Sequence, residues 1–313
     1  MTNHALCLRQ RYPGEWGRSG WTPRLEGTDT TCGPFQPVTS DEAGMRRPAA
    51  PAPHPPNPSG AGSFAHSDLA LGFPFLPAKN EARSDARGLA VMAEGPRYAI
   101  YFVPPAVSGF YRFGSSVLGY DCYSGDSVPL AEELTGAAWR QLAEEPRCYG
   151  FHATLKAPFH LAAEHSEAAL IESVRSFAAS EQIIPTITPA VEILSGFAAL
   201  VPRLRDASVD DLAAQCTTQF DSFRAPMSAR ERARRLAAPL SPEQVENLDR
   251  WGYPYVFAHF RFHMTLTGRL PAEAREAAIE TLRRCFERRC GYRTIAIDRV
   301  VLPRNHYVIG LEQ

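Results

Sequence analysis

The chain lacks the cysteine pattern of a disulfide-stabilised or zinc-binding protein. Its seven cysteines are odd in number and irregular in spacing, and no two of them form a C-x-x-C pair. This usage favours a reducing compartment. Long apolar runs are missing as well, because no stretch approaches the roughly 18 residues that a membrane-spanning helix needs. Arginines also interrupt the N-terminal stretch where the apolar part of a signal peptide would lie, so we expect a cytoplasmic protein with no membrane partner.

An excess of positive charge is absent too. The chain has 33 Lys and Arg against 34 Asp and Glu, for a formal net charge of −1. Proteins that bind duplex nucleic acid carry a strongly basic surface, so DNA is not an expected partner. A small phosphorylated substrate needs only a few local cations. The same is true of a single RNA terminus, so the charge allows both.

Proline is spread unevenly along the chain. Residues 1–91 hold 12 of the 27 prolines, including the run RPAAPAPHPPNPSGAG that starts at Arg47. Proline removes backbone donors and fixes φ, and the apolar residues of this stretch follow neither helical nor strand periodicity. We therefore expect a disordered N-terminal extension over residues 1–91 and one folded domain over residues 97–313.

One phrase occurs twice in the predicted domain. FHATLKAPF begins at Phe151 and FHMTLTGRL begins at Phe262, so the two histidines are 263 − 152 = 111 residues apart. Each copy is followed by a predicted helix and then by a predicted hairpin, over residues 166–180 and 190–202 in the first half and from residue 271 to the end in the second. Such self-similarity indicates an internal duplication. The predicted fold class is α+β, with two pseudo-symmetric lobes around a central cleft, each with an antiparallel sheet and helices.

The residues around each copy alternate between polar and apolar. The alternation runs over residues 149–158 and 256–267, which predicts two strands that each bury one face. On a strand, His and Thr two residues apart point to the same side, about 6.5 Å from each other. Each half therefore offers an imidazole and a hydroxyl on one face. The members of these two polar faces are His152, Thr154, Lys156, Arg261, His263 and Thr265.

Two histidines and two threonines in one cleft suit the hydrolysis of a phosphodiester. A neutral imidazole takes a proton from the attacking water or hydroxyl, and a protonated imidazole gives one to the leaving oxygen. Threonine hydroxyls donate to the non-bridging oxygens, where negative charge builds up. We assign His152 and His263 as catalytic and Thr154, Thr265, Lys156 and Arg261 as substrate-binding. The scheme needs no metal or other cofactor, and it leaves open which histidine is the acid.

Other interpretations of nearby residues stay open. His259 and His263 are four apart, as in a helical zinc pair, but the alternation favours a strand and no acid stands at the position that such a motif requires. Tyr149 has the opposite parity to His152 and is expected in the core. Further candidates to line the cleft are Tyr101, Arg304, His306 and Tyr307. A non-catalytic module that binds nucleotides or RNA is the alternative from another functional class.

The paired His-x-Thr-Leu phrases resemble the 2H phosphoesterase superfamily, which includes RNA 2′,3′-cyclic phosphodiesterases. RYAIYFVPP, YGFHATLKAPF and WGYPYVFAHFRFHMTLTGRL are similar to a bacterial branch of it that is linked to phosphonate metabolism. The resemblance covers residues 97–313. It implies a bilobal α+β fold and a phosphodiesterase that uses His152, Thr154, His263 and Thr265. A small sugar or nucleotide cyclic phosphate is the expected substrate, and RNA ends with a 2′,3′-cyclic phosphate are the alternative.

Overall fold

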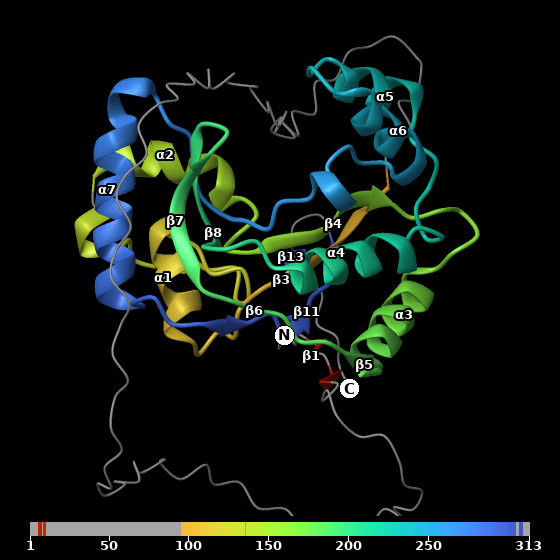
Figure 1. The fold of residues 1–313 in the computed structure, drawn as a ribbon, viewed down its shortest axis with the longest axis horizontal. Coiled ribbons are helices and arrows are strands. Elements are labelled where there is room, and N and C mark those ends of the chain that lie inside the picture. The colour runs from red at the N-terminus through yellow and green to blue at the C-terminus, as the bar shows by residue number, and fades with distance from the viewer. Residues whose placement is uncertain (1–5, 8, 11–94, 135, 305–306, 309–313) are drawn as a thin grey trace, which may run out of the picture. The chain divides into compact units, whose positions relative to one another are not determined.

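The computed structural model describes residues 6–7, 9–10, 95–134, 136–304 and 307–308, all of which lie in one of the two compact units of the chain. The other unit, Gly14–Leu69, lies outside the described residues. The described part is a mixed α+β fold, as predicted (Figure 1). Its helices are α1 Gly109–Leu118, η1 Glu132–Leu134, α2 Ala137–Arg147, α3 Glu167–Ala179, α4 Ala207–Gln219, α5 Ala229–Leu236, α6 Pro242–Trp251, η2 Phe257–His259 and α7 Ala272–Arg289.

One antiparallel sheet forms the centre of this unit. Its seven strands are β3 Arg97–Phe102, β4 Ala153–His160, β7 Pro189–Leu194, β8 Phe197–Pro202, β9 Met264–Arg269, β12 Pro303–Arg304 and β13 Tyr307–Val308. Their order is β13-β12-β3-β4-β9-β8-β7. The two strands that carry the repeated phrase, β4 and β9, are neighbours in the middle and pair at Ala153 and Met264. The two sheets expected from the duplication are therefore joined into one.

The two halves of the sequence interlock in this sheet. The hairpin β7–β8 follows α3 in the first half, but β8 pairs with β9 of the second half. The hairpin β12–β13 follows α7 in the second half, and β12 pairs with β3 of the first. Ser195 and Gly196 both have positive φ at the tip of the β7–β8 hairpin, as a type I′ turn requires. The hairpin predicted over residues 190–202 is thereby confirmed.

Buried apolar residues explain why the phrase repeats Phe and Leu as well as His and Thr. Phe151 and Phe262 are buried, and so are Leu155 and Leu266. Phe151 packs on Gly114 of α1 so closely that a Cβ there would lie 2.1 Å from the ring. These residues fix both ends of each motif in the core, which leaves the polar positions between them to face outward.

The strand predicted over residues 256–267 is shorter in the structure. Val256 is followed by the 3₁₀ helix η2, and β9 begins only at Met264. Phe257 has a φ of 52°, which ends an extended run at once. The alternation predicted the strand correctly only for the residues after His263.

Short strands from the N-terminal stretch also pair with the fold. These are β1 Leu6–Cys7, which pairs with β11 Arg299–Val300, and β2 Arg9–Gln10, which pairs with β5 Glu181–Gln182. Two further strands, β6 Thr186–Ile187 and β10 Ile295–Ala296, pair with each other. The rest of the predicted extension, 1–91, lies outside the described residues. Within the described part, no helix is long and apolar enough to cross a membrane.

Candidate active site

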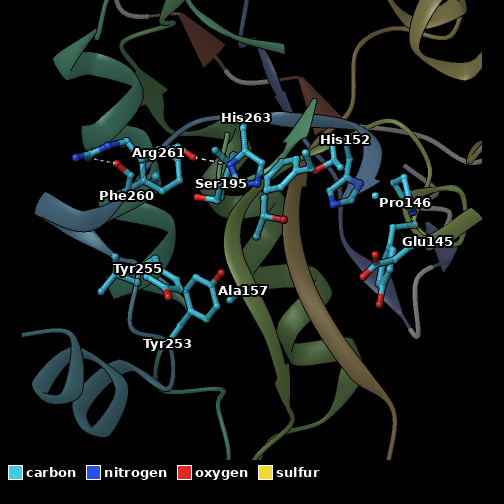
Figure 2. A pocket seen from close by; sticks show the side chains of 18 of the residues that line it. Glu145, Pro146, His152, Ala157, Ser195, Tyr253, Tyr255, Phe260, Arg261 and His263 are labelled. Atoms are coloured by element: carbon cyan, nitrogen blue, oxygen red, sulfur yellow. Dashed lines mark hydrogen bonds between the residues drawn. The ribbon is translucent and has the colours of Figure 1, made fainter. Parts of the chain in front are cut away.

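Both motif histidines line one pocket. His152 comes from the residue before β4 and His263 from the residue before β9. In the close-up they lie in a row between Arg261 and Glu145 (Figure 2). The pocket is also lined by Pro146, Tyr149, Gly150, Thr154, Leu155, Ala157, Ser195, Phe197, Ala213, Thr217, Tyr253, Tyr255, Val256, Phe257, Phe260, Thr265, Thr267, Gly268 and Arg269.

The register between β4 and β9 sets residues of one motif opposite residues of the other. Ala153 pairs with Met264 in an antiparallel ladder. One step further in either direction sets His152 opposite Thr265 and Thr154 opposite His263. Directly opposed residues point to the same face of a sheet, with Cβ atoms about 5 Å apart. The pairing of β4 with β9 therefore gathers all four polar side chains on one face.

The two imidazoles are held in the same way. Nδ1 of His152 is 2.9 Å from the carbonyl oxygen of Gly150, and Nδ1 of His263 is 2.8 Å from the carbonyl oxygen of Arg261. In both cases the acceptor lies two residues earlier in the chain. A carbonyl accepts only from a protonated nitrogen, so Nδ1 carries the proton. This leaves Nε2 of each ring as the atom that can exchange a proton with a ligand.

The contact between His152 and the carbonyl of residue 150 depends on the glycine at that position. Gly150 has a φ of 71°, and a Cβ on it would lie 2.4 Å from Cβ of Cys122. A residue with a side chain would therefore be strained in its backbone and would collide with its neighbour. Gly150 turns the chain so that its carbonyl faces the ring of His152.

The environments of the two rings differ. His152 stacks on Tyr101 of β3, with ring centroids 3.9 Å apart and an interplanar angle of 23°. His263 instead packs at a tilt against Phe197 of β8, at 5.8 Å. Burial lowers the pKa of His263, and the hydrogen bond to the Arg261 carbonyl opposes that shift. The two motifs are therefore alike in the backbone contact of each histidine and differ in the aromatic rings beside them.

Lys156 does not face the pocket, although strand parity puts it with His152. Its Nζ donates to the carbonyl of Thr217 at 2.9 Å and forms an ion pair with Asp221 at 3.3 Å, and the side chain is only 4% exposed. The cause is a register shift between β3 and β4. Tyr101 pairs with Thr154, but the residue before it, Ile100, pairs with Lys156. Adjacent residues of β3 point to opposite faces, so Lys156 leaves the face of Thr154.

Arg261 lines the pocket, as the sequence suggested. Its side chain is exposed, and one guanidinium nitrogen donates to the carbonyl oxygens of Ala258 and Phe260. Tyr101 reaches the site through its stack on His152. Arg304 pairs with Glu167 at 3.4 Å and is not among the residues that line the pocket. His306 and the side chain of Tyr307 lie outside the described part of the chain.

Several residues of the pocket escaped the sequence prediction. Tyr149 was expected in the core but is half-buried and lines the pocket, with its ring 6.4 Å from that of His152. Glu145 precedes it at the end of α2, and Tyr253 and Tyr255 come from the turn after α6 (Figure 2). Spacing gave no signal for these residues, because a helix end and a loop bring them to the strands.

A metal pair at His259 and His263 does not form. His259 lies in η2, its Nε2 is 3.9 Å from a carboxylate oxygen of Glu243, and it is not among the residues that line the pocket. Within the described residues, no group of three or more His, Cys, Asp or Glu side chains is arranged to hold a metal ion.

The comparisons with known proteins cover most of the site. Residues 154–307 match the model of a family described as "Protein of unknown function (DUF1045)". The chain is 36% identical over 217 residues to ribose 1,5-bisphosphate phosphokinase PhnN of Janthinobacterium sp. (strain Marseille). It is 39% identical over 175 residues to the protein of the same name from Laribacter hongkongensis (strain HLHK9).

The shared segment is a part of each curated relative. The two alignments cover 67% and 56% of this chain, but only 48% and 40% of the relatives. This chain therefore spans less than half the length of the curated relatives it matches.

A crystal structure of a conserved protein of unknown function from Agrobacterium tumefaciens strain C58 is 12% identical, with a TM-score of 0.36, and the match covers 69% of this chain and 86% of that one.

Proposed function

We propose that the protein is a metal-independent phosphoesterase that hydrolyses a cyclic phosphodiester of a small sugar or nucleotide. The observation that carries the proposal is the matched geometry of His152 and His263. Each ring contacts the carbonyl two residues before it through Nδ1, and each lies across the sheet from the threonine of the other motif. A phosphodiester between the rings would meet one Nε2 for the attacking water and one for the leaving oxygen.

The surroundings of the two rings support an assignment of the two roles. Burial lowers the pKa of His263, so this ring is neutral near neutral pH and suits the general base. Tyr101 presents its ring face to His152, and an aromatic face attracts a cation. This stack favours His152 as the general acid that donates a proton to the leaving oxygen. The pair then exchanges one proton at each end of the reaction without a metal ion.

Thr154 and Thr265 complete the scheme. Both line the pocket, and both are partly exposed. Their hydroxyls can donate to the non-bridging oxygens, whose charge grows as water adds to phosphorus. Arg261 supplies an exposed cation at the same pocket and would attract the anionic substrate.

The names of the relatives support a small phosphorylated sugar. Both are named for a kinase that acts on ribose 1,5-bisphosphate. The phosphate-binding loop of a P-loop kinase has a lysine directly after a glycine. The two lysines of this chain, Lys79 and Lys156, follow Ala78 and Leu155, so this chain contains no such loop. We infer that the shared segment contributes a second activity on a related compound. Together with the resemblance to the phosphonate-linked branch, this favours a ribose-based cyclic phosphate.

A nucleotide or the end of an RNA is the second candidate. Tyr253, Tyr255 and Phe260 line the same pocket on the side away from His152 (Figure 2). Bases stack on aromatic side chains, and each such contact is worth about 1–3 kcal/mol. These rings would hold the base of a 2′,3′-cyclic nucleotide while its phosphate lies at the histidines.

Turnover tests the proposal. The purified protein is assayed with ribose cyclic phosphates and with 2′,3′-cyclic nucleotides, in excess chelator. We expect hydrolysis that chelator does not reduce. His152→Ala and His263→Ala should each lower kcat by at least about 10²-fold, the scale of one acid or base group. His165→Ala serves as the matched control, because His165 is a histidine outside the pocket.

Three other results would point elsewhere. Tight binding without turnover in the wild type would favour a non-catalytic module. Loss of activity in chelator would overturn the metal-independent mechanism. Full activity of either motif variant would exclude that imidazole from the reaction.

A further inference from the structure

Glu145 is a carboxylate in the pocket with no role in the two-histidine scheme. It lies at the end of α2, is half-buried, and lines the pocket on the same side of the close-up as His152 (Figure 2). A carboxylate beside a reacting phosphodiester is unexpected, because two negative charges repel each other at short range. Its presence therefore needs a ligand group other than the phosphate.

The fold places this carboxylate by close packing. At Gly268 of β9, an added Cβ would lie 3.3 Å from Oε2 of Glu145 and 3.4 Å from the carbonyl oxygen of Leu142. The missing side chain lets the end of α2 approach the strand that carries Thr265. Glu145 also lies near Tyr149, where its charge adds to the rise in pKa that burial causes.

The carboxylate has no partner among the described residues. Neither a hydrogen-bond donor nor a cation contacts it there, and burial alone raises its pKa. Arg261 stands beyond the two histidines in the close-up (Figure 2), and Arg269, which also lines the pocket, lies against Gly196. The carboxylate is only half-buried and lines the pocket, so a ligand in the pocket that brings a donor can form a charge-assisted hydrogen bond with it.

We propose that Glu145 accepts a hydrogen bond from a substrate hydroxyl next to the phosphate, so that the pocket selects cyclic phosphates of polyols with a free hydroxyl. This inference rests on the proposed phosphoesterase function and narrows its substrate class. The phosphate lies at His152 and His263, and the hydroxyl side of the substrate points toward Glu145. An additional phosphate belongs at the Arg261 side, where the charge is favourable.

Two small substrates test this directly. Glycerol 1,2-cyclic phosphate and propane-1,2-diol cyclic phosphate differ only by one hydroxyl group. A hydrogen bond to a charged acceptor is worth a factor of about 10 to 100, so the wild type should prefer the glycerol compound by this factor in kcat/KM. Glu145→Ala should lower the preference below about 3-fold, through a loss in kcat/KM that is larger for the glycerol compound than for the propanediol compound. Glu145→Gln should keep part of it, because an amide oxygen still accepts.

The neighbouring residue provides the control. Glu144 lies on the same helix turn but is exposed and not among the residues that line the pocket, so Glu144→Ala should keep the full preference. Equal hydrolysis of both compounds by the wild type would overturn the inference and leave the phosphoesterase proposal standing. An equal loss with both compounds in Glu145→Ala would mean that Glu145 only supports the fold, which also overturns it. Failure of the wild type with every cyclic phosphate would refute the proposed function itself.

Discussion

Tyr101 and His152 lie face to face in the protein, with ring centroids 3.9 Å apart. Tyr101 lies in β3 and His152 directly precedes the neighbouring strand β4, where Thr154 pairs with Tyr101. His263 instead meets Phe197 at a tilt of 55°, with ring centroids 5.8 Å apart. This difference breaks the symmetry of the duplicated motifs and leads to the first prediction.

Replacing the ring of Tyr101 should change the acid and not the base. In Tyr101→Leu the stack on His152 is lost, and with it an interaction of about 0.5–1.5 kcal/mol. Because the protonated ring loses more than the neutral one, the alkaline limb of the kcat pH profile should move to lower pH. Tyr101→Phe keeps the ring and should keep the limb in place. A shift of the acid limb instead would reverse the assigned roles.

The pH profile of the wild type should be bell-shaped, with its acid limb below 6.5. Burial lowers the pKa of His263 from its ordinary value, so the base becomes protonated only under more acidic conditions. The same shift acts on stability. The unfolded chain binds a proton at His263 first, so the free energy of unfolding falls as pH drops from 6.5 toward the lowered pKa. Rate measurements from pH 4 to 9 test the limb, and a flat profile would contradict both histidine roles.

The threonine hydroxyls should contribute to the rate more than to binding. Thr154→Val or Thr265→Val removes one donor to the phosphate oxygens, and such a loss lowers kcat by about 10²- to 10³-fold. Thr→Ser at either position keeps the hydroxyl and should retain most of the activity. Thr267→Val is an informative contrast, because the Thr267 hydroxyl accepts from the backbone amide of Ala198 and is buried. We expect that variant to lower the melting temperature more than it lowers kcat.

Lys156 and Arg261 should behave in opposite ways. Lys156→Met removes a buried cation from Asp221, although Asp221 keeps its ion pair with Arg224. We expect a loss of about 1–3 kcal/mol in the free energy of unfolding, below the usual cost of breaking a buried pair because Asp221 stays paired. The folded variant should keep kcat/KM within about 3-fold. Arg261→Met should raise KM with an unchanged melting temperature. Urea titration and steady-state kinetics on both variants separate the two roles.

Gly150 should tolerate no side chain. Gly150→Ala forces a residue with Cβ into a φ of 71° and against Cys122. Backbone strain of this kind costs about 1–3 kcal/mol. Because the carbonyl of Gly150 holds Nδ1 of His152, the variant should lose activity even at temperatures where circular dichroism shows it folded. Gly125→Ala, at a turn with open space around it, has the same backbone penalty and should keep full specific activity.

The sequence was sufficient to predict the α+β class, the hairpin over residues 190–202, and the convergence of His152 and His263 in one pocket. The class and the hairpin follow from local pattern, because periodicity fixes which side chains share a face and turn residues fix φ. The shared pocket was predicted from the repeat, which gives the two histidines equivalent places. The prediction from local pattern was wrong for Lys156, because pairing with a neighbouring strand changes the face to which this side chain points. The register shift between β3 and β4 turned Lys156 away from the site, and nothing within the strand itself encodes that shift.

The amino-acid sequence by itself determined the pair of imidazoles, the pair of hydroxyls and the apolar residues that anchor them, since these lie within a few residues of one another in each motif. Only the tertiary structure decided what surrounds them. The stack of Tyr101 on His152, the lowered pKa of His263 and the approach of Glu145 past Gly268 all join residues distant in sequence. Burial and packing arise only when separate segments meet, so single-strand periodicity carries no record of them.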